Sequence, residues 1–97
     1  MDTTQVETGL GVGKTALVTG SRRGIGLGIA KKLAEMGYTL YLSATGAEQE
    51  VAPLLEELNG QYGNRFSYIR CDITHREQRA AILDRIWEER GALDLLV

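Results

Sequence analysis

The stretch Thr19-Gly20-Ser21-Arg22-Arg23-Gly24-Ile25-Gly26 decides how this chain is expected to fold. It follows an apolar run at residues 15–18 and precedes a helical pattern through Ile29, Leu33 and Met36. A buried strand, a glycine turn and a helix place the unpaired N–H groups of the first helical turn, and the positive end of the helix dipole, toward an anion. The stretch therefore predicts a phosphate-binding turn.

Each glycine of this turn has a predicted role. Gly20 can take backbone angles closed to other residues where the strand ends, and the bare Gly24 lets the chain approach a pyrophosphate. Gly26 allows the helix to pack closely on the strand. Arg22 and Arg23 add positive charge beside the site. Glycines also make ordinary turns, but the strand–loop–helix setting favours nucleotide binding.

The spacing T-G-x-x-x-G-x-G differs from the G-x-G-x-x-G of other dehydrogenases and resembles the fingerprint of the short-chain dehydrogenase/reductase family, T-G-x-x-x-G-I-G. The segment ALVTGSRRGIGLGIAKKLAEMGYTL is most similar to the 3-oxoacyl-[acyl-carrier-protein] reductase-like branch, and the resemblance runs from about Lys14 to the last residue. It implies hydride transfer between a nicotinamide and a carbonyl or alcohol. It also implies a homo-oligomeric, tetrameric parent protein.

A second phosphate-binding pattern is suggested by Gly13-Lys14-Thr15, which ends like the P-loop G-x-x-x-x-G-K-[ST]. Thr8 stands where the first glycine belongs, and the residues after Thr15 form a predicted strand. A P-loop needs a strand before it and a helix after it, so this context argues against a P-loop hydrolase.

The composition is that of an ordinary globular domain. The 97 residues are 43% hydrophobic and 25% charged, with a formal net charge of −2, which gives no electrostatic footprint for nucleic acid. No apolar run approaches the roughly 20 residues of a membrane helix. A single cysteine, Cys71, cannot form an internal disulfide, which fits a cytoplasmic protein. Residues 1–13 are predicted to be a flexible leader and residues 14–97 the start of a dinucleotide-binding domain.

Strand-like and helix-like segments alternate after the glycine turn. Strands are predicted at residues 15–19, 39–43 and 65–70, with a fourth beginning in residues 93–97, and helices at residues 24–36 and 74–90. A further helix carries Val51, Leu54, Leu55 and Leu58. It either starts near Ala52, with Pro53 in its first turn, or starts earlier and loses a hydrogen bond at Pro53.

Three details of these segments are also predicted. Asn59-Gly60 and Gly63-Asn64 mark the turn before the third strand. Thr74 to Glu77 has the spacing of a capping box. The last helix is predicted to turn four residues inward: Ala80, Leu83, Ile86 and Trp87. Strand–helix alternation with short connections predicts an α/β, Rossmann-type doubly wound parallel sheet of order 3-2-1-4, with the cofactor crevice at the carboxyl ends of the strands.

The residues after the second strand bear on which dinucleotide binds. A carboxylate about 20 residues past the glycine turn selects NAD by accepting hydrogen bonds from the ribose hydroxyls, but Ser43-Ala44-Thr45 contains none. Family resemblance associates a basic residue at the position of Arg23 with NADP. We therefore predict that NADP(H) is preferred over NAD(H), with Ala44 and Thr45 beside the ribose. The alternative is that Arg22 and Arg23 are solvated loop charges.

The third strand is followed by Asp72 and Ile73. By resemblance, the aspartate hydrogen-bonds the adenine amino group and the next residue contacts the ring, whereas the alternative is that Asp72 only caps the following helix. His75 is predicted to be a surface residue, and with Cys71 and Asp72 it lacks zinc-site spacing. Trp87 and Tyr68 are predicted to pack in the interior.

The catalytic residues that the resemblance implies, a serine and a Tyr-x-x-x-Lys pair, are absent from these residues. No tyrosine has a lysine four positions on, and the chain stops where an Asn-Ala-Gly segment should begin. We therefore expect this chain to be the cofactor-binding N-terminal part of a longer carbonyl reductase, inactive and poorly stable or self-associating by itself. A non-catalytic nucleotide-binding or redox-sensing protein of the same fold is the alternative.

Overall fold

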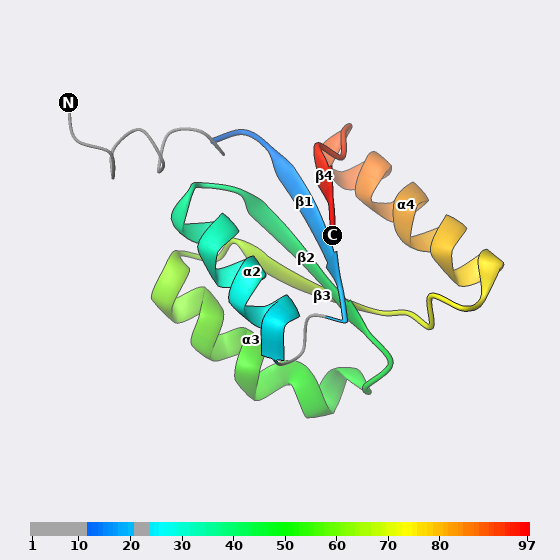
Figure 1. Ribbon diagram of the computed structural model, residues 1–97, viewed down its shortest axis with the longest axis horizontal. Helices are drawn as coiled ribbons and strands as arrows, with labels where there is room; N and C mark the ends of the chain where they lie inside the picture. Colours follow the sequence, from blue (N-terminus) through cyan, green and yellow to red (C-terminus); the bar gives the residue numbers. More distant parts are fainter. Residues whose placement is uncertain (1–11, 21–23) are drawn as a thin grey trace.

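A computed structural model of the chain describes residues 12–20 and 24–97, so most of the predicted leader lies outside the described residues. Strands and helices alternate along these residues (Figure 1). Their bounds are β1 Thr15–Thr19, α2 Gly24–Glu35, β2 Thr39–Ala44, α3 Glu48–Tyr62, β3 Phe66–Arg70, α4 Arg76–Arg90 and β4 Leu95–Leu96.

The four strands form one parallel sheet in the order β3-β2-β1-β4, which confirms the predicted order. Thr15 pairs with Thr39, Leu40 pairs with Phe66, and Ala16 pairs with Leu95. Because the strands are parallel, their carboxyl ends all reach the same edge of the sheet. In Rossmann-type folds ligands bind at this carboxyl edge.

The two faces of the sheet are covered by different helices. Successive side chains of a strand point to opposite faces. Ala16 and Val18 of β1 therefore join the larger core cluster with α2 and α3, whereas Leu17 joins a smaller cluster with α4. Figure 1 shows α4 apart from the α2–α3 pair. The smaller cluster consists of Leu17, Tyr41, Cys71, Ile82 and Ile86.

The α2 helix returns the chain to the sheet through a glycine. Gly37 has φ +100°. Its N–H donates to the Ala34 carbonyl at 3.0 Å, and the Tyr38 N–H donates to the Leu33 carbonyl at 3.1 Å. This pair of bonds is a Schellman motif, which satisfies carbonyls left open at the helix end and requires a left-handed residue. The chain then enters β2, which pairs with β1. The α2 helix thus connects two neighbouring strands of the sheet.

The α3 helix starts at Glu48, so the earlier of the two predicted starts is the one observed. Pro53 lies inside the helix, where its missing N–H leaves the Gln49 carbonyl without that helical bond. The prediction that Asn59-Gly60 lies in the following turn is wrong, because the helix continues to Tyr62 and ends at Gly63. The Asn59 side chain instead donates to the Phe66 carbonyl at 3.1 Å and accepts from the Phe66 N–H at 2.8 Å.

The predicted capping box at Thr74 is wrong. The Thr74 hydroxyl donates to the Asp72 carboxylate at 2.6 Å instead of accepting from the helix. The α4 helix begins later, at Arg76, with His75 as its N-cap residue and no side-chain capping bond. The local turn at Asp72 therefore outcompetes the cap for the threonine.

The predicted inward face of α4 is also largely wrong. Ile86 is buried as predicted, but its buried partner is Ile82, while Leu83 and Trp87 remain 44% and 65% exposed and Ala80 is exposed. Two polar contacts at the end of the helix explain this rotation. The Tyr41 hydroxyl donates to Glu89 at 2.8 Å, and Arg90 donates to the Thr15 hydroxyl at 3.2 Å. These contacts join the same end of α4 to β2 and β1, and the buried residues Ile82 and Ile86 face the sheet.

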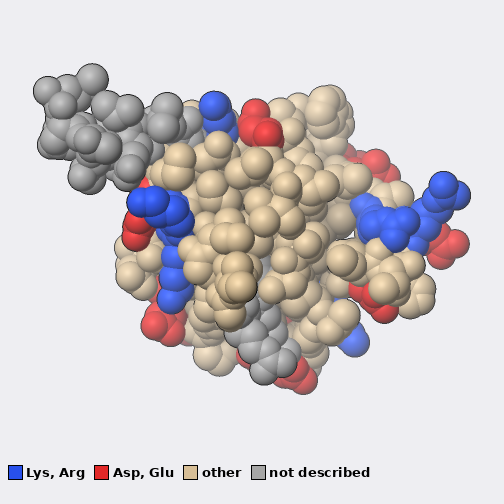
Figure 2. Space-filling model, in the orientation of Figure 1, with Lys and Arg blue, Asp and Glu red and all other residues tan. Residues whose placement is uncertain are grey.

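Tyr68 packs in the larger core cluster, so its predicted interior role is confirmed, whereas that of Trp87 is wrong. Large apolar side chains are exposed on and near α4 and β4: Ile73, Leu83, Trp87, Leu96 and Val97. Figure 2 shows one face of the molecule with an uncharged centre and with acidic and basic residues at its margins. The expected low stability or self-association of the chain stays a prediction.

Candidate functional site

Gly20 and Gly24 stand on either side of the segment that joins β1 to α2, and both have positive φ. β1 ends at Thr19 on the carboxyl edge, Gly20 has φ +60°, and Gly24, the first residue of α2, has φ +66°. Positive φ of this size is a conformation that glycine adopts without the penalty that other residues incur. The predicted site residues Ser21, Arg22 and Arg23 lie outside the described residues.

Space is left open beside both glycines. A Cβ atom added at Gly20 or at Gly24 would meet no atom of the described residues within 4 Å. The first turn of α2 contains no acidic residue that would repel an anion from its N-terminus. Ile25 is 85% exposed and Gly26 is half-buried. The N-terminus of α2 is therefore open to solvent at the carboxyl edge, as a phosphate site requires.

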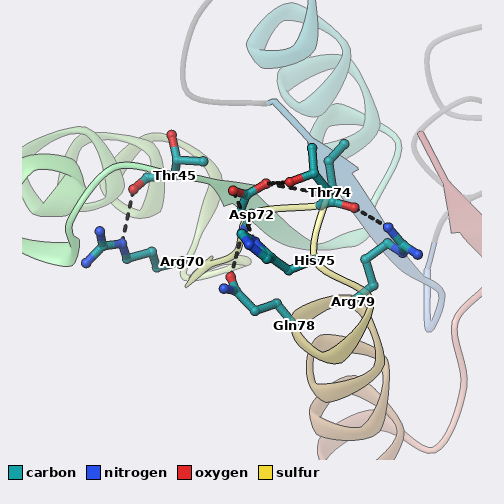
Figure 3. Close-up of polar contacts among 8 residues, drawn as sticks. Thr45, Arg70, Asp72, Thr74, His75, Gln78 and Arg79 are labelled. Atoms are coloured by element: carbon teal, nitrogen blue, oxygen red, sulfur yellow. Dashed lines mark hydrogen bonds and ion pairs between the residues drawn. The ribbon is translucent and has the colours of Figure 1, made fainter.

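The loops after β2 and β3 lie side by side and form a second part of the site. Thr45, Arg70, Asp72 and Gln78 line a hollow of about 430 Å³. Thr45 and Asp72 were predicted site residues that are separate in sequence, and the sheet brings them to one place. Figure 3 shows Thr45 beside Arg70, and Asp72 among Thr74, His75 and Gln78.

β3 holds the loop after β2 by side-chain bonds to consecutive carbonyls. The Tyr68 hydroxyl lies within hydrogen-bond distance of the Ala44 carbonyl at 3.0 Å and of the Gly46 carbonyl at 2.6 Å. Arg70 Nε donates to the Thr45 carbonyl at 3.1 Å. The Ala44 carbonyl also accepts from the Cys71 N–H at 2.9 Å, which continues the sheet. Ala44, the last residue of β2, and Thr45, the first residue after it, are the predicted ribose-side residues, and both are thus bonded to β3.

Asp72 makes a local turn at the start of the α4 loop. Its Oδ1 atom accepts from the Thr74 N–H at 2.9 Å and from the Thr74 hydroxyl at 2.6 Å. His75 Nδ1 lies 3.2 Å from its Oδ2 atom. The Thr74 hydroxyl and N–H, with a smaller contribution from His75, hold the pKa of Asp72 below its usual range. The carboxylate is therefore ionised at neutral pH.

The geometry does not show Asp72 as a cap of α4. Its carboxylate bonds to Thr74 and faces His75, both before the helix starts at Arg76, and α4 has no side-chain capping bond. The Asp72 carboxylate is partly exposed beside Thr45 and Arg70, at the place expected for adenine. The Asp72 N–H donates to the Gln78 side-chain carbonyl at 2.7 Å, which ties the loop to the first turns of α4.

Ile73 faces a different hollow from Asp72. This apolar pocket of about 320 Å³ lies on the α4 side of the sheet and is lined by Leu17, Thr19, Ser43, Cys71, Ile73, Arg79, Ile82, Leu83, Leu96 and Val97. The Arg79 guanidinium donates to the Ile73 carbonyl, which fixes the loop over the pocket. The two adjacent residues Asp72 and Ile73 thus offer a polar and an apolar surface at the same edge.

Sequence analysis missed Arg70 and Gln78. Arg70 was assigned to the end of the third strand without any role, because nothing in the linear pattern indicates which loop it meets. The register that pairs Arg70 with Ala44 brings it to Thr45. Among the described residues, no group of three or more His, Cys, Asp or Glu side chains could hold a metal ion. No helix among them is both long and apolar enough to span a membrane.

Comparison with known protein families identifies the family of this chain. The family model described as short chain dehydrogenase matches residues 14–97, which is most of the chain. The chain belongs to the short-chain dehydrogenase family. The fold agrees with this assignment, because the parallel 3-2-1-4 sheet with its glycine turn is Rossmann-type, and solved short-chain dehydrogenases share it.

Members of the short-chain dehydrogenase family with known names are moderately similar. The 3-oxoacyl-[acyl-carrier-protein] reductase FabG of Staphylococcus aureus is 33% identical over 84 residues, which cover 87% of this chain and 34% of that protein. The D-beta-hydroxybutyrate dehydrogenase of Rhizobium meliloti is also 33% identical over 84 residues, covering 87% of this chain and 33% of that protein.

Among solved structures, the citronellol catabolism dehydrogenase AtuB of Pseudomonas aeruginosa superimposes with a TM-score of 0.82. It is 32% identical, and the match covers 91% of this chain and 36% of that one. The chain thus spans about a third of the length of the relatives that it matches.

Proposed function

We propose that this chain is the dinucleotide-binding part of an oxidoreductase that uses NADP(H) in preference to NAD(H). In the whole protein it would serve the reduction of a carbonyl, either a 3-oxoacyl thioester or another ketone. The observation that carries the proposal is the positive φ of Gly20 and Gly24 at the carboxyl end of β1. That geometry presents open backbone and a helix N-terminus to an anion, which suits the diphosphate of a dinucleotide.

The strand order supports one arrangement of the cofactor along the carboxyl edge. The diphosphate would lie at Gly20–Gly26, beside β1. The ribose would lie at Ala44 and Thr45, after β2. The adenine would lie at Asp72 and Ile73, after β3, where the carboxylate accepts the amino group and the isoleucine contacts the ring. In this proposal the neighbouring strands β3, β2 and β1 would hold successive parts of one ligand, which the observed strand order allows.

The preference for NADP(H) is supported by charge. Ser43, Ala44 and Thr45 contain no carboxylate that would repel a 2′-phosphate. Arg22 and Arg23 follow the first glycine and add positive charge within the same turn. Guanidinium groups match phosphate oxygens by paired hydrogen bonds.

In the whole protein, the proposed reaction would need proton-transfer groups in addition to this cofactor-binding part. The bound nicotinamide supplies the hydride, and the chain's own residues orient the cofactor. No Tyr-x-x-x-Lys pattern occurs in the 97 residues. We further propose that the whole protein is cytoplasmic, consistent with a single buried cysteine, and homo-oligomeric, as the family resemblance implies. The similarity to FabG supports an acyl-thioester substrate, and the similarity to a hydroxybutyrate dehydrogenase supports the wider class of carbonyl compounds.

The test is to titrate the chain with NADPH, NADH and ATP and to measure binding by isothermal calorimetry and nucleotide fluorescence. We expect the affinity for NADPH to exceed that for NADH by at least about tenfold, because charge-assisted hydrogen bonds to the extra phosphate are strong. Equal affinity for NADPH and NADH would contradict the cofactor preference, and binding of ATP alone would contradict the whole proposal. A non-catalytic sensor of the same fold would bind NADPH equally well, so turnover of an acetoacetyl thioester by the whole protein separates it from a reductase.

A further inference from the structure

Arg70 lies beside Ala44 and Thr45, the residues proposed to contact the adenosine ribose. It is the last residue of β3 and pairs in register with Ala44, the last residue of β2. Arg70 is exposed, and it lines the same hollow as Thr45 and Asp72. Figure 3 shows its guanidinium turned toward the Thr45 backbone. The side chain therefore stands at the ribose end of the proposed cofactor site.

One hydrogen bond orients this guanidinium. Nε donates to the Thr45 carbonyl at 3.1 Å, and among residues 12–20 and 24–97 this is the only acceptor that Arg70 contacts. An arginine has five N–H donors in one plane, so the Thr45 bond uses one and leaves the two terminal nitrogens to bind another acceptor. The orientation is set before a ligand arrives, which reduces the entropy lost on binding.

The carboxylate that shares this hollow is not paired with Arg70. The Asp72 carboxylate lines the same hollow, but its Oδ1 atom accepts two bonds from Thr74 and its Oδ2 atom faces His75. Those local donors hold the carboxylate toward the α4 loop. Arg70, in contrast, bonds to a neutral carbonyl on the β2 side, where residues 43–45 contain no acid.

We propose that Arg70 is a specificity-determining residue that receives the 2′-phosphate of NADP(H). The inference rests on the proposed function and extends it. The glycine turn binds the diphosphate that all dinucleotides share. Arg70, fixed on the loop after β2, binds the one group that distinguishes NADP(H) from NAD(H). The guanidinium adds its charge from the third strand, independently of Arg22 and Arg23 in the turn.

The experiment compares two nucleotides on the full chain by isothermal calorimetry. Adenosine 2′,5′-bisphosphate carries the distinguishing phosphate, and 5′-AMP lacks it. The variants are Arg70→Gln, which removes the charge, and Arg70→Lys, which keeps the charge without the planar guanidinium. The control is Arg65→Gln, because Arg65 lies just before the other end of β3 and donates to the carbonyls of Tyr62 and Gly37. It loses the same charge at the opposite edge of the sheet.

We expect Arg70→Gln to weaken adenosine 2′,5′-bisphosphate about tenfold, the usual effect of losing a charge-assisted bond to phosphate, and to leave 5′-AMP within about twofold. Arg70→Lys should fall between wild type and Arg70→Gln, and Arg65→Gln should resemble wild type for both nucleotides. Equal weakening of both nucleotides by Arg70→Gln would show that Arg70 only supports the Thr45 loop, and no weakening would show that it does not meet the ligand. Either result overturns this inference and leaves the proposed function standing. A wild-type chain that binds neither nucleotide overturns both.

Discussion

Replacing Gly24 by alanine tests whether this glycine is needed only for its backbone conformation or also for ligand binding. Gly24 has φ +66°, and a Cβ atom there would meet no atom of the described residues within 4 Å. The cost to folding is therefore conformational only. A left-handed residue costs about 1–2 kcal/mol. The smaller entropy of the unfolded alanine chain offsets about 0.4–1 kcal/mol of this. The expected net loss is about 1 kcal/mol of unfolding free energy.

The matched control is Gly91→Ala. Gly91 ends α4 with φ +74°, and a Cβ atom there likewise meets nothing within 4 Å. It should lose about the same 1 kcal/mol, because its φ is also positive and of similar size. Gly91 lies at the other edge of the sheet, so this variant should keep the wild-type affinity for NADPH.

The difference between the two variants lies in cofactor binding. In Gly24→Ala the added methyl group occupies the space where the diphosphate would approach the backbone. Displacing one charged oxygen from an N–H group costs about 1.5–3 kcal/mol, which is about 10- to 100-fold in affinity. Urea unfolding followed by far-UV circular dichroism gives the stability, and calorimetric titration with NADPH gives the affinity. Both variants binding NADPH as tightly as wild type, with equal stability losses, would refute the placement of the diphosphate at Gly24.

Two further predictions concern the fold. Ile86 is 1% exposed and Trp87 is 65% exposed. In urea unfolding, Ile86→Ala should lower the unfolding free energy by about 2–5 kcal/mol, and Trp87→Ala should lower it by less than about 0.5 kcal/mol. A larger loss in Trp87→Ala than in Ile86→Ala would contradict the observed orientation of α4. Burial and the bond to Glu89 raise the pKa of Tyr41 from 10.0 to about 12, which favours its neutral form in the folded state. The stabilisation is complete below pH 10 and is lost as the pH rises toward 12, so the unfolding free energy should fall over that interval in the wild type and fall less in Tyr41→Phe. Identical alkaline profiles would contradict this linkage.

Much of the architecture could be predicted from local sequence. Apolar runs at Thr15–Thr19 and Thr39–Ala44, separated by a glycine turn and an amphipathic helix, admit few arrangements other than parallel strands with a crossover. The positive φ of Gly20 was also predicted, because this glycine stands where the strand ends, whereas the positive φ of Gly24 was not predicted. Such features depend on neighbours in the chain, which the sequence displays directly.

Features that depend on competition between neighbouring groups were predicted less well. Thr74 has the spacing of a cap, but Asp72, two residues earlier, takes its hydroxyl. Leu83 and Trp87 are apolar, yet contacts of Glu89 and Arg90 with β2 and β1 rotate them outward. In each case a specific polar bond decides between two arrangements that the apolar pattern allows.

By itself, the sequence determined the order of strands, the glycine turn and the absence of an acid after β2. Only the tertiary structure decided that Arg70 meets Thr45 and that Asp72 and Ile73 face different hollows. The physical reason is that a parallel sheet joins residues through register. Arg70 and Thr45 are separated by a whole helix in the chain, and only the pairing of β3 with β2 brings the guanidinium to the carbonyl.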